Sequence, residues 1–363
     1  MKSILSYSLL AAAMAAGVAI GQTPTTATTT PVGYTSISCL PGSDTIVGLP
    51  LRLSASAAGA LTSAPSTSGS QAVLTVSGAS FGSFAGTHYV KFKESATAKG
   101  KWFPVASNTA DTLTIDLNGV TLSAAIGDKI EVLKFWTLAE LIDPSTATDN
   151  PATTPNAIVA SSNIGPTGRK TEVLVPNFLA TGINIAPSTV YFIHGGIWKK
   201  QGGVNNSFNN DQLWPDSYII IRNPASIGSS TKFVVSGEVE TGNFEVAVNT
   251  LAAGKQDNFV ALPRPIDTKL KDLGLGGTAA FVSSDGIGPT QRKDELLVFN
   301  NAAAALNKSA SAIYFYHAGI WKKQGGVNAD FGDDVIPAGG GFILRKFQSG
   351  TGATATWNNA PSY

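Results

Sequence analysis

The chain has 363 residues, of which 43% are hydrophobic and 13% charged, and its formal net charge is +1. Soluble domains usually carry about 25% charged residues, so this chain is poor in charge. The near-neutral balance excludes a protein that binds nucleic acid through a basic surface, and the apolar fraction excludes a disordered polar tail. The single cysteine, Cys39, excludes an internal disulfide and a cysteine-based metal cluster.

The N-terminus has the pattern of a secretory signal peptide. A short basic start is followed by an apolar run from Leu5 to Ile20 and by small residues, with cleavage expected near Gly21-Gln22. This run is shorter than the roughly 20 residues of a membrane-spanning helix, and no later run is long enough. We therefore expect residues 1–22 to be removed and the mature protein to be extracellular or in the cell envelope.

The remaining chain has the pattern of many short strands, which are β-branched or aromatic runs bounded by Gly, Pro, Asn and Ser. The expected strands are 44–51, 72–77, 88–92, 102–106, 112–117, 129–135, 172–175, 190–194, 218–222 and 232–236, with equivalents further along. Only Thr137–Ile142 and Thr268–Leu273 have a helical spacing, of one or two turns each. This pattern predicts an all-β fold of sandwiches or small barrels.

An internal duplication is the strongest signal in the sequence. The ten residues GIWKKQGGVN begin at Gly196 and recur at Gly319, 123 residues later (319 − 196). The same offset aligns residues 159–222 with residues 282–345 without a gap. An identity of this length predicts two copies of one structural module.

An upstream match places extra chain inside the first copy. The segment DTIVGLP at residue 44 resembles DNFVALP at residue 257, an offset of 213, so the first copy holds 90 more residues (213 − 123). A match of WTLAEL to KLKDL at an offset of 132 places most of them before Trp136. The predicted fold is two duplicated β-sandwich-like modules with a small β domain inserted in the first. The predicted ranges are 23–54 and 135–240 for the first module, 55–134 for the insert, and 241–363 for the second module.

The repeated tryptophans Trp198 and Trp321 are candidate ligand-binding residues, together with Lys199 and Lys322. An indole on a rigid β scaffold can stack on a sugar ring. A tryptophan packed over the module core would repeat just as faithfully, and paired lysines are typical of a solvated face. Buried tryptophans would indicate packing, whereas a coplanar exposed pair would indicate sugar binding.

Three carboxylates, Asp330, Asp333 and Asp334, surround a glycine and can supply oxygen ligands to a cation such as Ca²⁺. The first copy has Ser207 and Asn210 in place of Asp330 and Asp333, and the spacing does not fit an EF-hand. A polar hairpin loop is therefore the favoured interpretation, and the sequence predicts no cofactor.

A G-x-S-x-G pattern places Ser80 between Gly78 and Gly82. A hydrolase nucleophile must lead into a helix, and the residues after Gly82 have no helical period, so a glycine-rich turn is favoured. The three histidines are interpreted as core or turn residues, and no catalytic set converges.

Two further features have structural interpretations. Arg222 and Arg345 end apolar strands, where we expect them to pair with Asp211 and Asp334. Cys39 either bridges two chains in an oxidising compartment or is a buried small hydrophobe, and the second interpretation is favoured.

Several segments together resemble a paralogous family of exported bacterial β-rich proteins of unknown function. They are SDTIVGLP, KWFPVASNTADTLTIDLNG, GDKIEVLKFWTL, the repeated GIWKKQGGVN and DDVIPAGGGFILRK. The resemblance covers essentially the whole mature chain and implies no substrate, catalytic residue or cofactor. The two copies differ at one loop, which reads WPDSY from Trp214 and PAGGG from Pro337.

The sequence therefore predicts an exported, non-enzymatic protein with a structural or a cell-surface or matrix interaction role. Its edge strands can pair with a second copy or with a partner. The alternative is a carbohydrate-binding protein that uses Trp198 and Trp321 on a cell-surface glycan. An outer-membrane β-barrel and a hydrolase using Ser80 are less favoured, and neither a nucleic-acid partner nor a transmembrane helix is expected.

Overall fold

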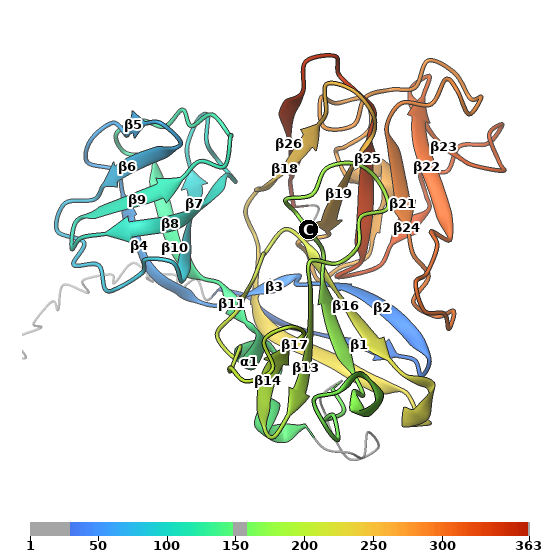
Figure 1. Ribbon diagram of the computed structural model, residues 1–363. Coiled ribbons are helices and arrows are strands. Elements are labelled where there is room, and N and C mark those ends of the chain that lie inside the picture. Colours follow the sequence, from blue (N-terminus) through green and yellow to red (C-terminus); the bar gives the residue numbers. More distant parts are fainter. Residues whose placement is uncertain (1–29, 148–157, 362–363) are drawn as a thin grey trace, which may run out of the picture. The chain divides into compact units, whose positions relative to one another are not determined.

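The computed structural model describes residues 30–147 and 158–361, so the predicted signal peptide lies outside the described residues. Almost every regular element in these ranges is a strand of an antiparallel sheet, which confirms the all-β, sandwich-like fold class (Figure 1). The helical elements are α1 (Leu138–Leu141) and four single 3₁₀ turns, η1 (Pro144–Thr146), η2 (Pro166–Gly168), η3 (Ala225–Ile227) and η4 (Leu270–Asp272). No helix in the described ranges is both long and apolar enough to cross a membrane.

A five-stranded antiparallel sheet forms the centre of the first module, residues 31–54 and 135–240. Its strands, in spatial order, are β14 (Ile197–Lys200), β13 (Thr189–His194), β12 (Glu172–Val175), β16 (Tyr218–Asn223) and β2 (Ser43–Gly48). A second sheet has the order β1 (Val32–Cys39), β17 (Thr231–Val239) and β3 (Leu51–Arg52), and a short pair joins β11 (Trp136–Thr137) to β15 (Gln212–Leu213). Their inward side chains form one core that includes Val173, Ile193 and Phe233.

The second module, residues 241–361, repeats this arrangement. Its five-stranded sheet has the order β23 (Ile320–Lys323), β22 (Ala312–His317), β21 (Glu295–Val298), β25 (Gly341–Lys346) and β19 (Gln256–Ala261). It is accompanied by the pairs β18 (Phe244–Thr250) with β26 (Ala353–Asn359) and β20 (Thr268–Lys269) with β24 (Val335–Ile336). Each strand of the larger sheet occupies the place of its repeat equivalent in the first module.

Residues 55–134 form a sheet of their own, which we call the inserted segment. Its strands, in spatial order, are β4 (Ala55–Ala60), β10 (Lys129–Lys134), β7 (His88–Glu94), β8 (Trp102–Asn108), β9 (Thr112–Asp116), β6 (Gln71–Thr75) and β5 (Ser66–Ser68). Alternate residues of β9 are buried, as expected for strands with one face on a core, and that core includes Leu74, Val90 and Phe103.

The single turn of α1 is explained by its cap. The Glu140 backbone N–H donates to Thr137 Oγ1 at 3.3 Å, and the Thr137 hydroxyl donates to the Glu140 carboxylate at 3.0 Å. The first bond is an N-cap, which satisfies one of the free N–H groups at the start of a helix. Of the two segments with helical spacing, Thr137–Ile142 forms α1 and Thr268–Leu273 forms the 3₁₀ turn η4.

The two five-stranded sheets contact each other through β2 and β16 on one side and β19 and β25 on the other. The small apolar cluster between them includes Ile46, Tyr218 and Phe259, and the rings of Tyr218 and Phe259 are edge to face at 5.9 Å. A Cβ atom on Gly341 would lie 2.6 Å from Tyr218 Cβ. Gly341 is the repeat equivalent of Tyr218, so the tyrosine of one copy is accommodated by the missing side chain of the other.

Buried ion pairs join the inserted segment to the first module. Lys91 Nζ lies 2.5 Å from the Glu240 carboxylate, and Arg52 donates to Glu131 at 2.9 Å. Burial is the main cause that lowers the pKa of Lys91, and the neighbouring Glu240 opposes it. Because unpaired charges are costly inside a protein, each of these groups fixes the position of its partner.

Candidate functional site

The repeated tryptophans are core residues in the structure. Trp198 is 0% and Trp321 3% exposed. The Trp198 indole N–H donates to the carbonyl of Ile142 at 3.1 Å, and the Trp321 ring packs on Phe281 at 5.1 Å between centroids. Neither indole face is available for a sugar ring, so the geometry supports the packing interpretation.

The lysines beside the tryptophans do not form a solvated face throughout. Lys322 is buried, and Lys199 is partly buried on β14. The next lysines along each strand lie over aromatic rings, with Lys323 Nζ at 5.2 Å from the Tyr314 ring centre and 5.4 Å from that of Phe331. The strands β14 and β23, which carry these lysines, are therefore packed structural elements, and the charge pattern did not predict this.

The three carboxylates of the second copy have separate partners. Asp333 pairs with Lys269 and Lys271, and hydrogen bonds from these two lysines lower its pKa to about 2. Asp334 accepts from the Tyr314 hydroxyl at 2.6 Å, and Asp330 accepts from the Gly332 backbone N–H. Within residues 30–147 and 158–361, no group of three metal-ligating side chains is placed to hold an ion. The geometry therefore does not support the calcium interpretation.

The G-x-S-x-G segment lacks the structure that a hydrolase nucleophile needs. Ser80 has a φ of 54°, but the chain after Gly82 continues through turns into β7 and forms no helix. His194 and His317 bond through Nδ1 to the equivalent carbonyls of Ser161 and Ser284, both at 2.9 Å. These histidines have a repeated structural role.

The prediction for the two strand-ending arginines was wrong. Arg222 pairs with Asp44 across β16 and β2, while Asp211 accepts from the hydroxyl of Tyr191. In the second module Arg345 pairs with Asp257, which the β25–β19 register places opposite it. The nearer aspartates in sequence are not the partners because strand register brings distant residues together.

Each arginine–aspartate pair is covered by a loop from the other module. Asp44 accepts from the Asn307 backbone N–H at 2.7 Å, and Arg222 donates to the Asn307 side chain at 2.6 Å. In the mirrored arrangement, Asp257 accepts from the Asn184 N–H at 2.8 Å and Arg345 donates to Asn184 at 3.0 Å. Both asparagines have positive φ, which asparagine tolerates better than most residues. We call these two arrangements the reciprocal clamps.

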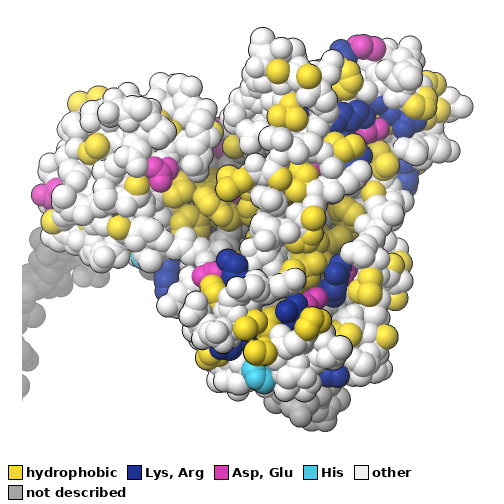
Figure 2. Space-filling view, viewed as in Figure 1, with side chains coloured by type: hydrophobic (Ala, Val, Ile, Leu, Met, Phe, Trp, Pro, Cys, Tyr) yellow, Lys and Arg dark blue, Asp and Glu magenta, His cyan; other side chains and the backbone are white. Residues whose placement is uncertain are grey.

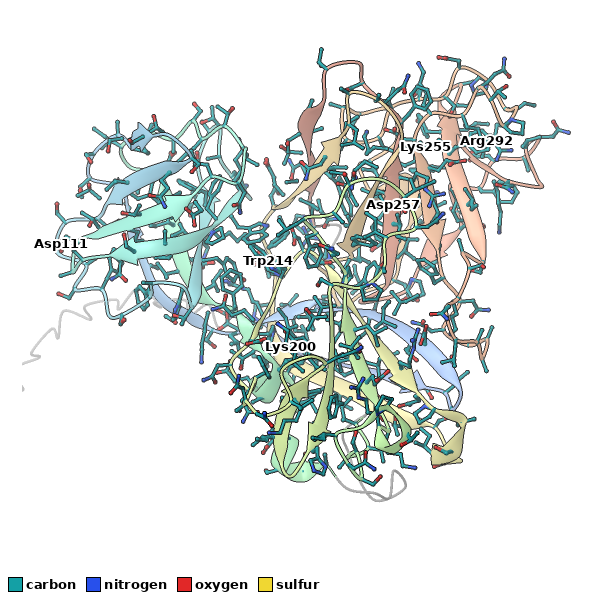
Figure 3. All side chains as sticks on the ribbon, in the orientation of Figure 1. Asp111, Lys200, Trp214, Lys255, Asp257 and Arg292 are labelled. Carbon is teal, nitrogen blue, oxygen red and sulfur yellow. The ribbon has the colours of Figure 1, made fainter. Side chains whose placement is uncertain are left out.

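One cavity of about 450 Å³ lies where the inserted segment and both modules meet. Its walls come from β8 and the turn that follows β9, from β18 and β19, and from two first-module loops that carry Phe178, Leu179 and Trp214. Trp214 is 38% exposed and its ring lies 5.4 Å from that of Trp102. Figure 2 shows hydrophobic side chains gathered around this hollow, and Figure 3 shows Trp214 beside it. This volume falls within the usual range for ligand pockets.

Besides Asp257, which pairs with Arg345, two further carboxylates line the cavity and give it an acidic character. Burial raises the pKa of Asp216 to about 7, and it also raises the pKa of Glu245. The Glu245 Oε2 atom is buried and has no hydrogen-bond partner in the described part of the chain. Lys101 is the one basic residue among the described residues that line the cavity. A carboxylate among aromatic rings attracts hydrogen-bond donors and cations.

The sequence patterns did not predict this site, although the repeat alignment contains a signal for it. Trp214 and Asp216 lie in the loop where the two copies differ, opposite Pro337 and Gly339 at the 123-residue offset. Phe178 likewise aligns with Asn301. Residues that maintain the common scaffold are the same in both copies of the repeat. Positions at which the two copies have different residues therefore mark features that only one copy has.

Comparisons with family models, curated proteins and solved structures found no match to this chain.

Proposed function

We propose that the chain is an exported, non-enzymatic interaction protein that binds a polypeptide of the cell envelope through the cavity beside Trp214. The single observation that carries this proposal is Trp214, 38% exposed, in a formed cavity where Glu245 Oε2 has no hydrogen-bond partner among the described residues. Aromatic residues on a rigid scaffold are the usual anchors of binding surfaces.

The scaffold suits a preformed site. Buried ion pairs hold the inserted segment, and the reciprocal clamps hold the modules, so the cavity walls are fixed before a partner arrives. A preformed site avoids the cost of ordering loops on binding.

Two measurements test this proposal. The first compares the full chain with one lacking residues 1–22, and expects only the full chain in the envelope or medium. The second measures binding of labelled mature protein to envelope preparations. Trp214→Ala should lower binding at least about tenfold, as expected for a central aromatic anchor.

Tyr34→Ala is the matched control, because Tyr34 is 70% exposed on β1 and lies outside the cavity. Equal binding by the wild type and both variants would contradict the proposal.

A carbohydrate partner is the second candidate, favoured by the accessible ring of Trp214 next to Trp102. This version places sugar stacking at the cavity and not at the buried repeat tryptophans. Protease treatment of the envelope should abolish binding of a polypeptide partner, whereas periodate oxidation should abolish binding of a carbohydrate.

A further inference from the structure

The outward N–H groups of Asp44, Ile46 and Gly48 on β2 are all bonded to the second module. The Asp44 N–H donates to the Ala305 carbonyl at 2.8 Å, and the Gly48 N–H donates to the Gly339 carbonyl at 2.7 Å. Between them, the Ile46 N–H donates to Asn301 Oδ1 at 3.0 Å, and Asn301 Nδ2 donates to the Ile46 carbonyl at 2.8 Å. One side-chain carboxamide therefore satisfies both backbone groups of Ile46.

Within the part of the chain that the structure describes, the equivalent edge of β19 is bonded at two of these three places. The Asp257 N–H donates to the Gly182 carbonyl at 2.8 Å, and the Ala261 N–H donates to the Asp216 carbonyl at 3.0 Å. Gly182 and Asp216 are the repeat equivalents of Ala305 and Gly339, so these bonds mirror those on β2. Phe259, which is equivalent to Ile46, lies midway between the two bonded residues.

Phe259 presents its backbone groups to the same side as Asp257 and Ala261, because alternate residues of a strand share their hydrogen-bonding direction. The position equivalent to Asn301 is Phe178, whose ring stands edge to face on Phe259 at 6.3 Å and offers no amide. Within residues 30–147 and 158–361, the Phe259 N–H and carbonyl have no hydrogen-bond partner. Both phenylalanines line the cavity.

We propose that this open position binds the primary carboxamide of an Asn or Gln side chain on the partner polypeptide, so the inference rests on the proposed function. The chain itself supplies the template, since Asn301 makes the same two bonds on the equivalent strand. An incoming β-strand does not fit, because the N–H groups on either side, at Asp257 and Ala261, are already bonded.

The geometry also separates a primary from a secondary amide. A primary carboxamide places an N–H and the carbonyl oxygen on the same side, and can bond both groups of one residue. A peptide bond or an acetamido group has its N–H trans to the carbonyl, so it can satisfy only one of them. The acidic groups Asp216 and Glu245 in the same cavity favour a basic residue next to the amide.

The test is a titration of ¹⁵N-phenylalanine-labelled mature protein, whose spectrum is confined to the amides of its 17 phenylalanines. The probe is acetyl-Gly-Lys-Asn-Ala-Gly N-methylamide, which has no terminal carboxamide. Matched peptides replace the asparagine by Nγ-methylasparagine or by aspartate, and an N-acetylglucosamine trimer represents the carbohydrate candidate. Phe259→Leu identifies the Phe259 signal.

The asparagine peptide should shift the Phe259 amide signal and slow its hydrogen exchange at least about tenfold, the effect of one new hydrogen bond. The Nγ-methylasparagine and aspartate peptides should not. Phe178→Asn should slow the same exchange with no peptide and abolish the titration. Leu179→Asn, at the neighbouring exposed position, should do neither.

Equal shifts from the asparagine and Nγ-methylasparagine peptides, or unchanged exchange in Phe178→Asn, would overturn the inference. If the trimer alone shifts the signal, the occupant is a carbohydrate and the inference fails. If Trp214→Ala weakens envelope binding but no peptide acts at Phe259, only this inference fails. If Trp214→Ala has no effect on envelope binding, the proposed function itself fails.

Discussion

The reciprocal clamp around Asp257 makes a quantitative prediction about stability. The Asp257 carboxylate is 0% exposed and accepts from Arg345 Nε at 2.7 Å, from Arg345 Nη2 at 3.0 Å and from the Asn184 N–H at 2.8 Å. Asp257→Ala leaves the guanidinium, whose side chain is 14% exposed, without its counter-ion. Breaking a buried ion pair from one side costs about 3–5 kcal/mol, and we expect this range.

The equivalent pair in the first module provides an internal comparison. Arg222 is 25% exposed, so water can solvate its guanidinium when Asp44 is removed. We therefore expect Asp44→Ala to cost about 2 kcal/mol, less than Asp257→Ala. The order of the two effects follows from the exposure of the arginines alone.

Urea unfolding of the single variants and of the double variant Asp257→Ala/Arg345→Met measures these effects. Removal of both charges should restore at least about half of the lost stability, because no unpaired ion is left. If Asp257→Ala costs under about 1 kcal/mol, or if the double variant is no more stable than the single one, the explanation by a buried unpaired charge is wrong.

Further predictions concern the acidic cavity, the core and the cysteine. A pKa of Asp216 that rises from 3.8 to about 7 corresponds to roughly 4 kcal/mol in favour of the protonated form, and because the residue is partly exposed to solvent we expect about 2 kcal/mol. Because the folded-state pKa lies above the unfolded one, the wild type loses this stability as pH rises from about 4 to about 7. Asp216→Asn should therefore be the more stable protein at pH 8 and equal to the wild type at pH 4, as measured by urea unfolding; equal stability at both pH values would contradict it. Trp198→Ala and Trp321→Ala should each cost about 3–5 kcal/mol in the same assay, and losses below about 1 kcal/mol would show that the indoles are not core residues. Cys39 is buried and burial raises its pKa to about 11, so a thiol reagent at pH 8 should label it only after unfolding; rapid labelling of the native protein would contradict this.

Local sequence patterns predicted a strand well where residues close in the sequence determine its limits. The predicted strand Glu172–Val175 holds the apolar run Val173–Val175, and it coincides with β12. The strand Ile197–Lys200 was not predicted, because its lysines suggested a solvated face and their packing over aromatic rings depends on a neighbouring loop.

The reciprocal clamps and the cavity were harder to predict, because residues far apart in the sequence form them. Strand register brings the residues of the clamps together. Asp44 and Asp257 were both visible as repeat equivalents, as were Arg222 and Arg345, but their pairing needs the β2–β16 and β19–β25 registers. The cavity is lined by separate stretches of the inserted segment and of both modules, so no single motif contains it. Only the differences between the two copies, such as Phe178 opposite Asn301, pointed to its position.

The central claim is that the two modules share one scaffold and leave one edge position open. The most direct test is amide hydrogen exchange at Ile46 and Phe259, measured in one sample of the unliganded protein. The Ile46 N–H is bonded to Asn301, whereas the Phe259 N–H has no partner in the described chain. We expect Ile46 to exchange at least about tenfold more slowly than Phe259. Equal protection of the two amides would show that the position at Phe259 is already filled, and would contradict the account.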